Sequence, residues 1–126
     1  MVNNMTKKVY VSHSKKFNFK NELYGPLKNL NEINFIFPHE KSEKPKPSKN
    51  IIKSSSAVIA EVSYPSTAVG IEIGWADAFN VPVICLYKKN SKISSSLKIV
   101  SKNFVEYDKI EKILPEIEHI LKSRGD

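Results

Sequence analysis

The sequence has a single cysteine, four glycines and no long hydrophobic run in its 126 residues. One cysteine excludes an intramolecular disulfide and suits a reducing compartment. Cys85 lies within the apolar run VPVICLY, so we expect it in the core. No apolar stretch approaches the roughly 20 residues that a transmembrane helix needs, and the N-terminal MVNNMTKK lacks the apolar segment of a signal peptide. These absences predict a cytoplasmic protein with no membrane partner.

Metal-binding and nucleic-acid-binding motifs are also absent from the sequence. Three scattered histidines and one cysteine show no spacing typical of a metal site, so we expect neither a metal nor a cofactor. The formal net charge of +7 favours phosphate-bearing partners. The lysines are dispersed, however, and no basic motif with interleaved aromatic residues appears. The charge therefore fits a well-solvated surface or a small anionic substrate better than nucleic acid.

Short apolar or β-branched runs alternate with segments of helical spacing along the whole chain. The runs predict five strands, at 8–12, 33–37, 57–62, 81–87 and 104–107. Helices are predicted at 17–31, 67–80 and 109–123, with a shorter one within 48–56. Pro26 predicts that the first of these helices is kinked or split, and Pro115 predicts a local bend in the last.

This alternation predicts one α/β domain spanning residues 1–126. Apolar strands separated by helices are typical of a mainly parallel sheet covered on both faces, and we expect a three-layer, doubly wound, flavodoxin-like fold. Residues 1–7 are predicted to be a flexible N-terminus. Residues 38–49, rich in lysine and proline, are predicted to be a mobile loop.

In such a sheet, ligands bind outside the carboxyl ends of the strands. Polar residues follow the first, second and fourth predicted strands: Ser12, His13, Ser14, Lys15 and Lys16, then His39 and Glu40, then Lys88 and Lys89. We expect Ser12, His13, Ser14 and Lys15 to contact the substrate. The lysines suit a phosphate group, although each also fits a solvated surface.

The stretch YPSTAVGIEIGWADAF, residues 64–79, places a carboxylate on the apolar side of a helix. Glu72 shares this face with Trp75, Ala76 and Phe79 and is flanked in sequence by Gly70 and Gly74. An acid near a helix N-terminus gains about 0.3–1 kcal/mol from the helix dipole, which is one sufficient explanation. Each glycine, however, costs about 0.5–1 kcal/mol relative to alanine. The lost volume favours close approach of a ligand or of another backbone.

The turn before this helix could hold a phosphate. Ser66 or Thr67 can cap the helix, and its free N–H groups point outward. The P-loop pattern is absent, so capping alone is an equally simple interpretation.

Residues 56–87 resemble the nucleoside 2-deoxyribosyltransferase superfamily, which includes the 2′-deoxynucleoside 5′-phosphate N-hydrolases. The motif is a strand ending in an acid, a turn, and then G-x-E-x-G-x-A-x-A. The matching positions are Glu61, Pro65, Ser66, Gly70, Glu72, Gly74, Ala76, Ala78 and Pro82. The resemblance implies a flavodoxin-like fold and cleavage or transfer at the N-glycosidic bond of a 2′-deoxynucleoside or its 5′-monophosphate.

The resemblance also implies roles for individual residues. Glu72 would attack the anomeric carbon, and water or a second base would resolve the glycosyl-enzyme. Ser66 would bind the 5′-phosphate, with Ala68 and Gly70 also in the substrate site. Ser96 would reach a neighbouring subunit's phosphate site, which implies a homodimer or a larger assembly.

The sequence departs from the superfamily pattern in two places. The loop SHSKKF after the first strand has no glycine, and the superfamily's aspartate before the third strand is missing. Ser48 and Ser56 occupy the matching positions. His39 and Glu40 are then the candidates for assisting the leaving base, which needs a proton or a donor.

Two alternative functions stay open at this point. Without the aspartate, the domain could be a catalytically degenerate module that binds or senses a nucleotide. The opening VYVSHSKKF also resembles TIR-like domains, which implies an NAD-cleaving or signalling role.

Overall fold

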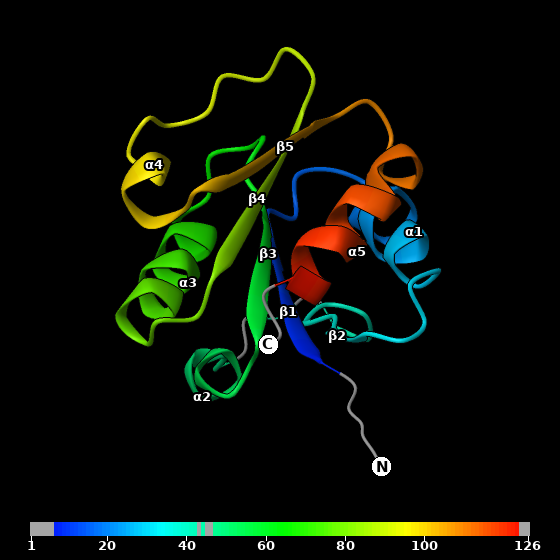
Figure 1. Cartoon of the computed structure of the whole chain (residues 1–126). Helices are drawn as coiled ribbons and strands as arrows, with labels where there is room; N and C mark the ends of the chain where they lie inside the picture. Colours follow the sequence, from blue (N-terminus) through cyan, green and yellow to red (C-terminus); the bar gives the residue numbers. More distant parts are fainter. Residues whose placement is uncertain (1–6, 43, 45–46, 124–126) are drawn as a thin grey trace.

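The sheet has the strand order β2-β1-β3-β4-β5, with every strand parallel to its neighbours. The computed structural model describes residues 7–42, 44 and 47–123 (Figure 1). The strands are β1 (Lys8–His13), β2 (Asn34–Ile36), β3 (Ala57–Glu61), β4 (Val83–Lys88) and β5 (Asn103–Tyr107). The predicted flavodoxin-like α/β fold is confirmed, because this order is that of a doubly wound sheet.

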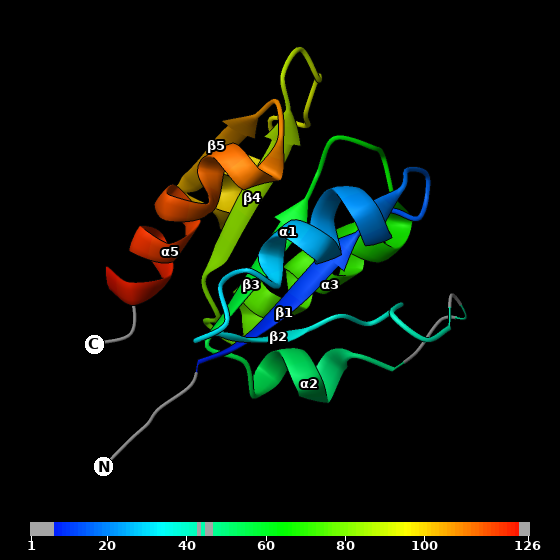
Figure 2. The ribbon, with the colours of Figure 1, turned by 90° about the vertical axis from the view of Figure 1, so that its right-hand side faces the viewer.

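Helices cover both faces of the sheet (Figures 1 and 2). One face carries a π-helical turn (Lys20–Tyr24), α1 (Gly25–Leu27), a 3₁₀ turn (Ile110–Ile113) and α5 (Leu114–Ser123). The other face carries α2 (Lys49–Lys53), α3 (Thr67–Ala78) and α4 (Leu97–Val100). Figure 2 views the sheet with α1 and α5 toward the reader and α3 behind it.

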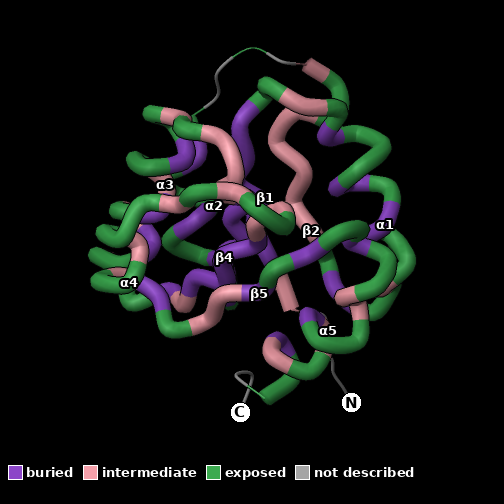
Figure 3. The backbone as a smooth tube through the Cα atoms, turned by 90° about the horizontal axis from the view of Figure 1, so that it is seen from above, coloured by how far each residue is buried: buried purple, intermediate pink, exposed green. Residues whose placement is uncertain are grey.

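Alternation along the strands builds the two halves of the core. In β1, Val9 and Val11 face the α1 and α5 layer, and Tyr10 faces the α3 layer. Buried residues follow the central strands, and exposed residues follow the outer sides of the helices (Figure 3). Cys85 is buried as predicted, and burial raises the pKa of its thiol to about 11. None of the described helices is long and apolar enough to cross a membrane.

Two predictions about the helices need comment, and one helix was not expected. Near Pro26, where a kink or split is predicted, the backbone stays helical and changes from a π-helical to an α-helical pattern at Gly25, with Pro26 in the opening turn of α1. Pro115 does not bend a continuous helix, because it is the second residue of α5 and follows a separate 3₁₀ turn. Helix α4 was not predicted, since four residues are too few to show a helical period.

Two predicted flexible segments are only partly described. Residues 1–6 of the N-terminus and residues 43, 45 and 46 of the 38–49 loop lie outside the described residues. The described part of that loop leads directly into α2, which confirms the short helix expected within 48–56.

The chain leaves β1 toward one face of the sheet and leaves β3 toward the other. The π-helical turn follows β1, and α3 follows β3. Pairing places Ser12 beside Ala60 and His13 beside Glu61, so both strands end at the same edge. This divergence between neighbouring strands is the position where doubly wound sheets bind ligands.

Candidate active site

Glu72 lies at this point of divergence and is held by three hydroxyl groups from distant parts of the chain. Tyr10 and Ser48 donate hydrogen bonds to Oε2 of Glu72 (2.7 and 2.5 Å), and Ser12 donates to Oε1 (2.7 Å). Glu72 is half-buried, and no basic residue in the described part of the chain forms an ion pair with it. Neutral donors therefore orient the carboxylate, and part of it stays accessible.

The alternation of β1 explains two of these donors. Tyr10 and Ser12 are two residues apart in a strand, so both side chains point toward the α3 layer. Burial, together with the negative charge of Glu72, raises the pKa of the Tyr10 hydroxyl far above its usual value. Tyr10 consequently keeps its proton and stays a donor to Glu72. Ser48 immediately precedes α2 and is buried.

His13 points to the opposite face of β1 and is buried among aromatic rings. Its ring lies 4.4 Å from that of Phe19 and 5.1 Å from that of Tyr24, centroid to centroid. Its Nδ1 is 2.8 Å from the carbonyl oxygen of Ser14, and its Nε2 is 2.5 Å from the Tyr24 hydroxyl. Burial lowers the pKa of His13 to about 4, so the imidazole is neutral at pH 7.

The other predicted residues of the first loop are near this edge but differ in exposure. Ser14 is buried, and its hydroxyl accepts a hydrogen bond from the Lys16 backbone N–H (3.1 Å). Lys15 and Lys16 are exposed. Lys88 forms an ion pair with Glu22 (2.8 Å). The substrate-binding roles of Ser12, His13, Ser14 and Lys15 stay predictions.

His39 and Glu40 follow β2, but neither is hydrogen-bonded to Glu72. The His39 backbone N–H donates to the Tyr24 hydroxyl (3.1 Å), and its Nδ1 lies 3.2 Å from the Ser42 carbonyl oxygen. The exposed Glu40 pairs with Lys28. The structure therefore brings His39 next to His13, with ring centroids 5.5 Å apart, and leaves Glu40 at the rim.

The two glycines of α3 do not flank Glu72 in space. Gly70 and Gly74 line a hollow of about 400 Å³ between α3 and α4, and a Cβ atom built at either position meets nothing within 4 Å. Glu72 does not line this hollow, because positions 70 and 74 face away from position 72 on a helix. The expectation that the glycines make room beside the carboxylate is therefore wrong.

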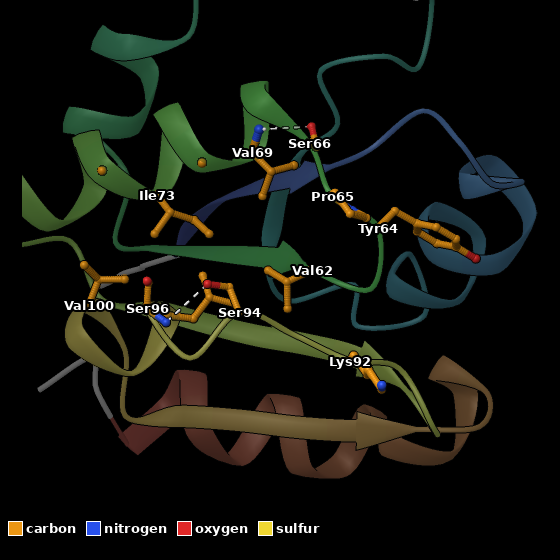
Figure 4. A pocket seen from close by; sticks show the side chains of 13 residues that line it. Val62, Tyr64, Pro65, Ser66, Val69, Ile73, Lys92, Ser94, Ser96 and Val100 are labelled. Atoms are coloured by element: carbon orange, nitrogen blue, oxygen red, sulfur yellow. Dashed lines mark hydrogen bonds between the residues drawn. The ribbon is translucent and has the colours of Figure 1, made fainter.

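The same hollow gathers the two serines that the sequence associates with phosphate. Ser66 caps α3 by accepting a hydrogen bond from the Val69 N–H (3.3 Å), which confirms the capping role. Figure 4 shows Val69 and Ile73 of α3 facing Ser94, Ser96 and Val100 across the hollow. Ala68 is exposed, one helical turn before Glu72.

Glu61 forms a second carboxylate network at the same edge of the sheet. It accepts hydrogen bonds from the Ser63 N–H (2.9 Å), the Ser63 hydroxyl (2.6 Å) and the Tyr107 hydroxyl. The Ser63 hydroxyl in turn accepts from the Lys88 N–H (2.7 Å). Glu61 therefore fastens the turn after β3 to β4 and β5.

Sequence reasoning missed Tyr10 as a partner of Glu72 and treated Ser48 only as a lost acid. The alternation of VYVS could have placed Tyr10 beside Ser12 on one face of the strand. Nothing in the sequence shows that α2 lies against α3, so the contact of Ser48 could not be found that way.

Comparison with curated proteins places this chain in a known superfamily. The chain is 37% identical over 75 residues to a 5-hydroxymethyl-dUMP N-hydrolase of Branchiostoma floridae, and the match covers 56% of the chain and 69% of that protein. The chain belongs to the nucleoside 2-deoxyribosyltransferase-like superfamily. No family model matches the sequence.

Other members of this superfamily are matched over shorter parts of their length. A 2′-deoxynucleoside 5′-phosphate N-hydrolase 1 of Syntrophotalea carbinolica is 30% identical over 73 residues, 56% of this chain. One of Methanosarcina barkeri is 44% identical over 45 residues, 36% of this chain. The chain spans about half of the first protein and 28% of the second.

Two solved structures share this fold over almost the whole chain. A CMP N-glycosidase of Clostridium botulinum superposes with a TM-score of 0.69 at 22% identity, covering 90% of this chain and 99% of that one. A conserved protein of Enterococcus faecalis superposes with a TM-score of 0.63 at 18% identity, covering 92% and 99%. At these identities the likeness shows the shared fold alone.

Proposed function

We propose that this superfamily member is an enzyme that cleaves the N-glycosidic bond of a 2′-deoxynucleoside 5′-monophosphate, with Glu72 as the nucleophile. The observation that carries the proposal is the Glu72 carboxylate, held by three neutral hydroxyls and half-exposed where β1 and β3 diverge. The curated relatives are named as N-hydrolases of such nucleotides, which supports the substrate class. The single buried cysteine supports a cytoplasmic location.

The hydrogen bonds favour one carboxylate oxygen for the attack on the anomeric carbon. Oε2 accepts two hydrogen bonds, from Tyr10 and Ser48, whereas Oε1 accepts one, from Ser12. Oε1 therefore has the more available lone pair and forms the bond to C1′. A glycosyl-enzyme intermediate divides the reaction into two steps with lower barriers. The negative carboxylate also stabilises the positive charge of the oxocarbenium-like transition state. Water then resolves the intermediate, which makes the reaction a hydrolysis rather than a transfer.

The 5′-phosphate binds at the start of α3 in this proposal. Ser66 caps the helix, and Ala68 and Gly70 present small surfaces in its first turn. The first loop, with Ser14 and Lys15, borders the same edge of the sheet. Free N–H groups at the start of a helix favour an anion there.

We also propose that the enzyme works as a homodimer or a larger homo-oligomer. Ser96 lines the hollow next to the start of α3, where it can serve the phosphate site of a neighbouring subunit. Ile71 on α3 and Ile99 on α4 are 48% and 83% exposed, and a partner would cover them. Sedimentation velocity over a concentration series tests the assembly, and a monomer at every concentration contradicts it.

A chromatographic assay for free base tests the proposed reaction. The protein is incubated with deoxynucleosides, their 5′-monophosphates, CMP and NAD. We expect base release from one or more deoxynucleotides, and a loss of about 10³-fold or more in Glu72→Gln, because the nucleophile is removed. Glu106→Gln, an exposed acid on β5, is the matched control and keeps full activity.

The other outcomes separate the remaining functions. Full activity in Glu72→Gln excludes Glu72 as the nucleophile. No base release, together with a nucleotide-dependent rise in melting temperature, indicates a binding module. Release of nicotinamide from NAD indicates the TIR-like alternative.

A further inference from the structure

Each hydroxyl among the described residues that contacts Glu72 uses its only hydrogen on Glu72. Tyr10, Ser12 and Ser48 each carry one O–H, and each donates it to a carboxylate oxygen at 2.5–2.7 Å. A group can give a proton to a leaving base only if that proton is available. None of these three hydroxyls can serve the base without releasing the nucleophile.

The neighbouring imidazoles direct an N–H group at the backbone and not at Glu72. A carbonyl oxygen only accepts, so Nδ1 of His13 must carry the hydrogen that faces Ser14. Nε2 of His13 then accepts from Tyr24, whose oxygen accepts from the His39 backbone N–H. The same argument places a hydrogen of His39 on Nδ1, toward the carbonyl oxygen of Ser42. Both imidazoles therefore direct their Nδ1 hydrogens at backbone carbonyl oxygens.

The carboxyl groups that the structure describes at this end of the sheet are engaged elsewhere. Glu40 pairs with Lys28, Glu22 pairs with Lys88, and Glu61 is enclosed by Ser63 and Tyr107. Across residues 7–42, 44 and 47–123, no second carboxylate hydrogen-bonds to Glu72 or to the hydroxyls that hold it. Ser48 is a positioning residue for Glu72 and not a proton donor to the base.

We propose that the base leaves as its anion, so that this protein selects nucleotides whose base is acidic at the glycosidic nitrogen. This inference rests on the proposed function. Oε1 of Glu72 forms a bond to C1′ while the C1′–N bond breaks and leaves its electron pair on the ring nitrogen. Carbonyl groups of the base spread the charge, and water protonates the released anion. The hydroxide left by this protonation takes a proton from a second water as that water attacks C1′, and the electrons of the C1′–Oε1 bond return to Glu72.

A pair of nucleotides of matched shape tests this selection. Bromine and methyl have similar size, but bromine withdraws electrons and makes the base a better anion. Single-turnover base release is therefore measured with 5-bromo-dUMP and with dTMP, under excess protein so that product release does not limit the rate. A second pair, 5-bromo-dCMP and 5-methyl-dCMP, serves if the site prefers cytosine. We expect the bromo compound to react at least about tenfold faster.

Two serine variants show whether the preference depends on the missing acid. Ser48→Asp introduces a carboxyl group against Glu72, and two carboxyl groups this close share a proton that one can donate. We expect this variant to reduce the bromo-to-methyl ratio to below about threefold. Ser56→Asp adds the same charge at an exposed position and should keep the wild-type ratio.

The outcomes distinguish the inference from the function on which it rests. A wild-type ratio close to one, with base released, leaves the proposed function standing and overturns the inference, because a proton donor must then act. The first residue to examine would be His39. No base release from either pair or from the deoxynucleotide panel overturns the proposed function, and the inference with it.

Discussion

Glu61 and Glu72 are two carboxylates with nearly the same donors and very different surroundings. Each accepts hydrogen bonds from a tyrosine hydroxyl and from serine, and neither has an ion-pair partner among the described residues. Glu61 is 0% exposed, whereas Glu72 is half-buried. The donor set therefore does not distinguish Glu61 from Glu72, the proposed nucleophile. The two residues differ in the exposure of the carboxylate.

The origin of the donors differs as well. The donors of Glu61 tie the end of β3 to β5 and, through Ser63, to Lys88 of β4. This network connects strands of one sheet. The donors of Glu72 come from β1 and from the residue before α2, so that network joins the sheet to a helical layer at its open edge. Glu61 is thus enclosed within the sheet, whereas the more accessible Glu72 lies between the sheet and a helical layer.

The largest expected effect is a difference in the free energy of unfolding between variants of Glu61 and of Glu72. We expect Glu61→Ala to lower the free energy of unfolding by about 4 kcal/mol, because it leaves buried donors unsatisfied and opens a cavity. Glu72→Gln should change it by less than about 1 kcal/mol, since Gln keeps the shape and one acceptor. Urea denaturation measures both. Equal losses would show that the two networks have the same structural role.

His13 lies on the face of β1 opposite to Tyr10 and Ser12, and it should make the stability of the protein depend on pH. The pKa of His13 is about 4 in the folded chain and 6.5 ordinarily, because burial disfavours the imidazolium. Between these values the unfolded chain binds a proton that the folded chain does not. The stabilisation is fully present above pH 6.5 and is lost as the pH falls toward 4, by about 3 kcal/mol in total.

Urea midpoints from pH 4 to 7 measure this effect as a difference between variants. His13→Gln should lack the part of the pH dependence that His13 contributes. His119→Gln, on an exposed helix position, should keep the wild-type profile. Identical profiles for wild type and His13→Gln would show that the His13 ring is solvated in the folded protein, and that water reaches the side of β1 next to Ser12.

The smallest effect concerns the face of α3 that turns away from Glu72. A Cβ atom at Gly74 meets nothing within 4 Å, so Gly74→Ala should stabilise the protein by about 0.5–1 kcal/mol through helix propensity. Ala78→Gly, at an exposed position of the same helix, is the matched control and should lose a similar amount. Thermal melts report both, and a destabilised Gly74→Ala would show that this face is packed in solution.

Part of the site could be predicted because its signals are local. Glu72, Ser66 and Glu61 stand in one continuous motif of strand, turn and helix, and the structure places Ser66 in the capping role that the sequence predicts. Tyr10 and Ser48 belong to no such motif, because they reach Glu72 across 62 and 24 residues. The glycine argument failed for a related reason, since spacing in a helix shows which residues share a face and not what that face meets.

By itself, the sequence determined a parallel α/β domain whose polar residues gather at the carboxyl ends of its strands. Hydrophobic periods of two and 3.6 residues report burial within a single element, and that information is present in neighbouring residues. Only the tertiary structure decided which hydroxyls hold Glu72, that Glu40 turns to Lys28, and that Gly70 and Gly74 line a hollow. These contacts depend on how strands pair and helices settle between layers, and a side-chain hydrogen bond forms only within about 3 Å.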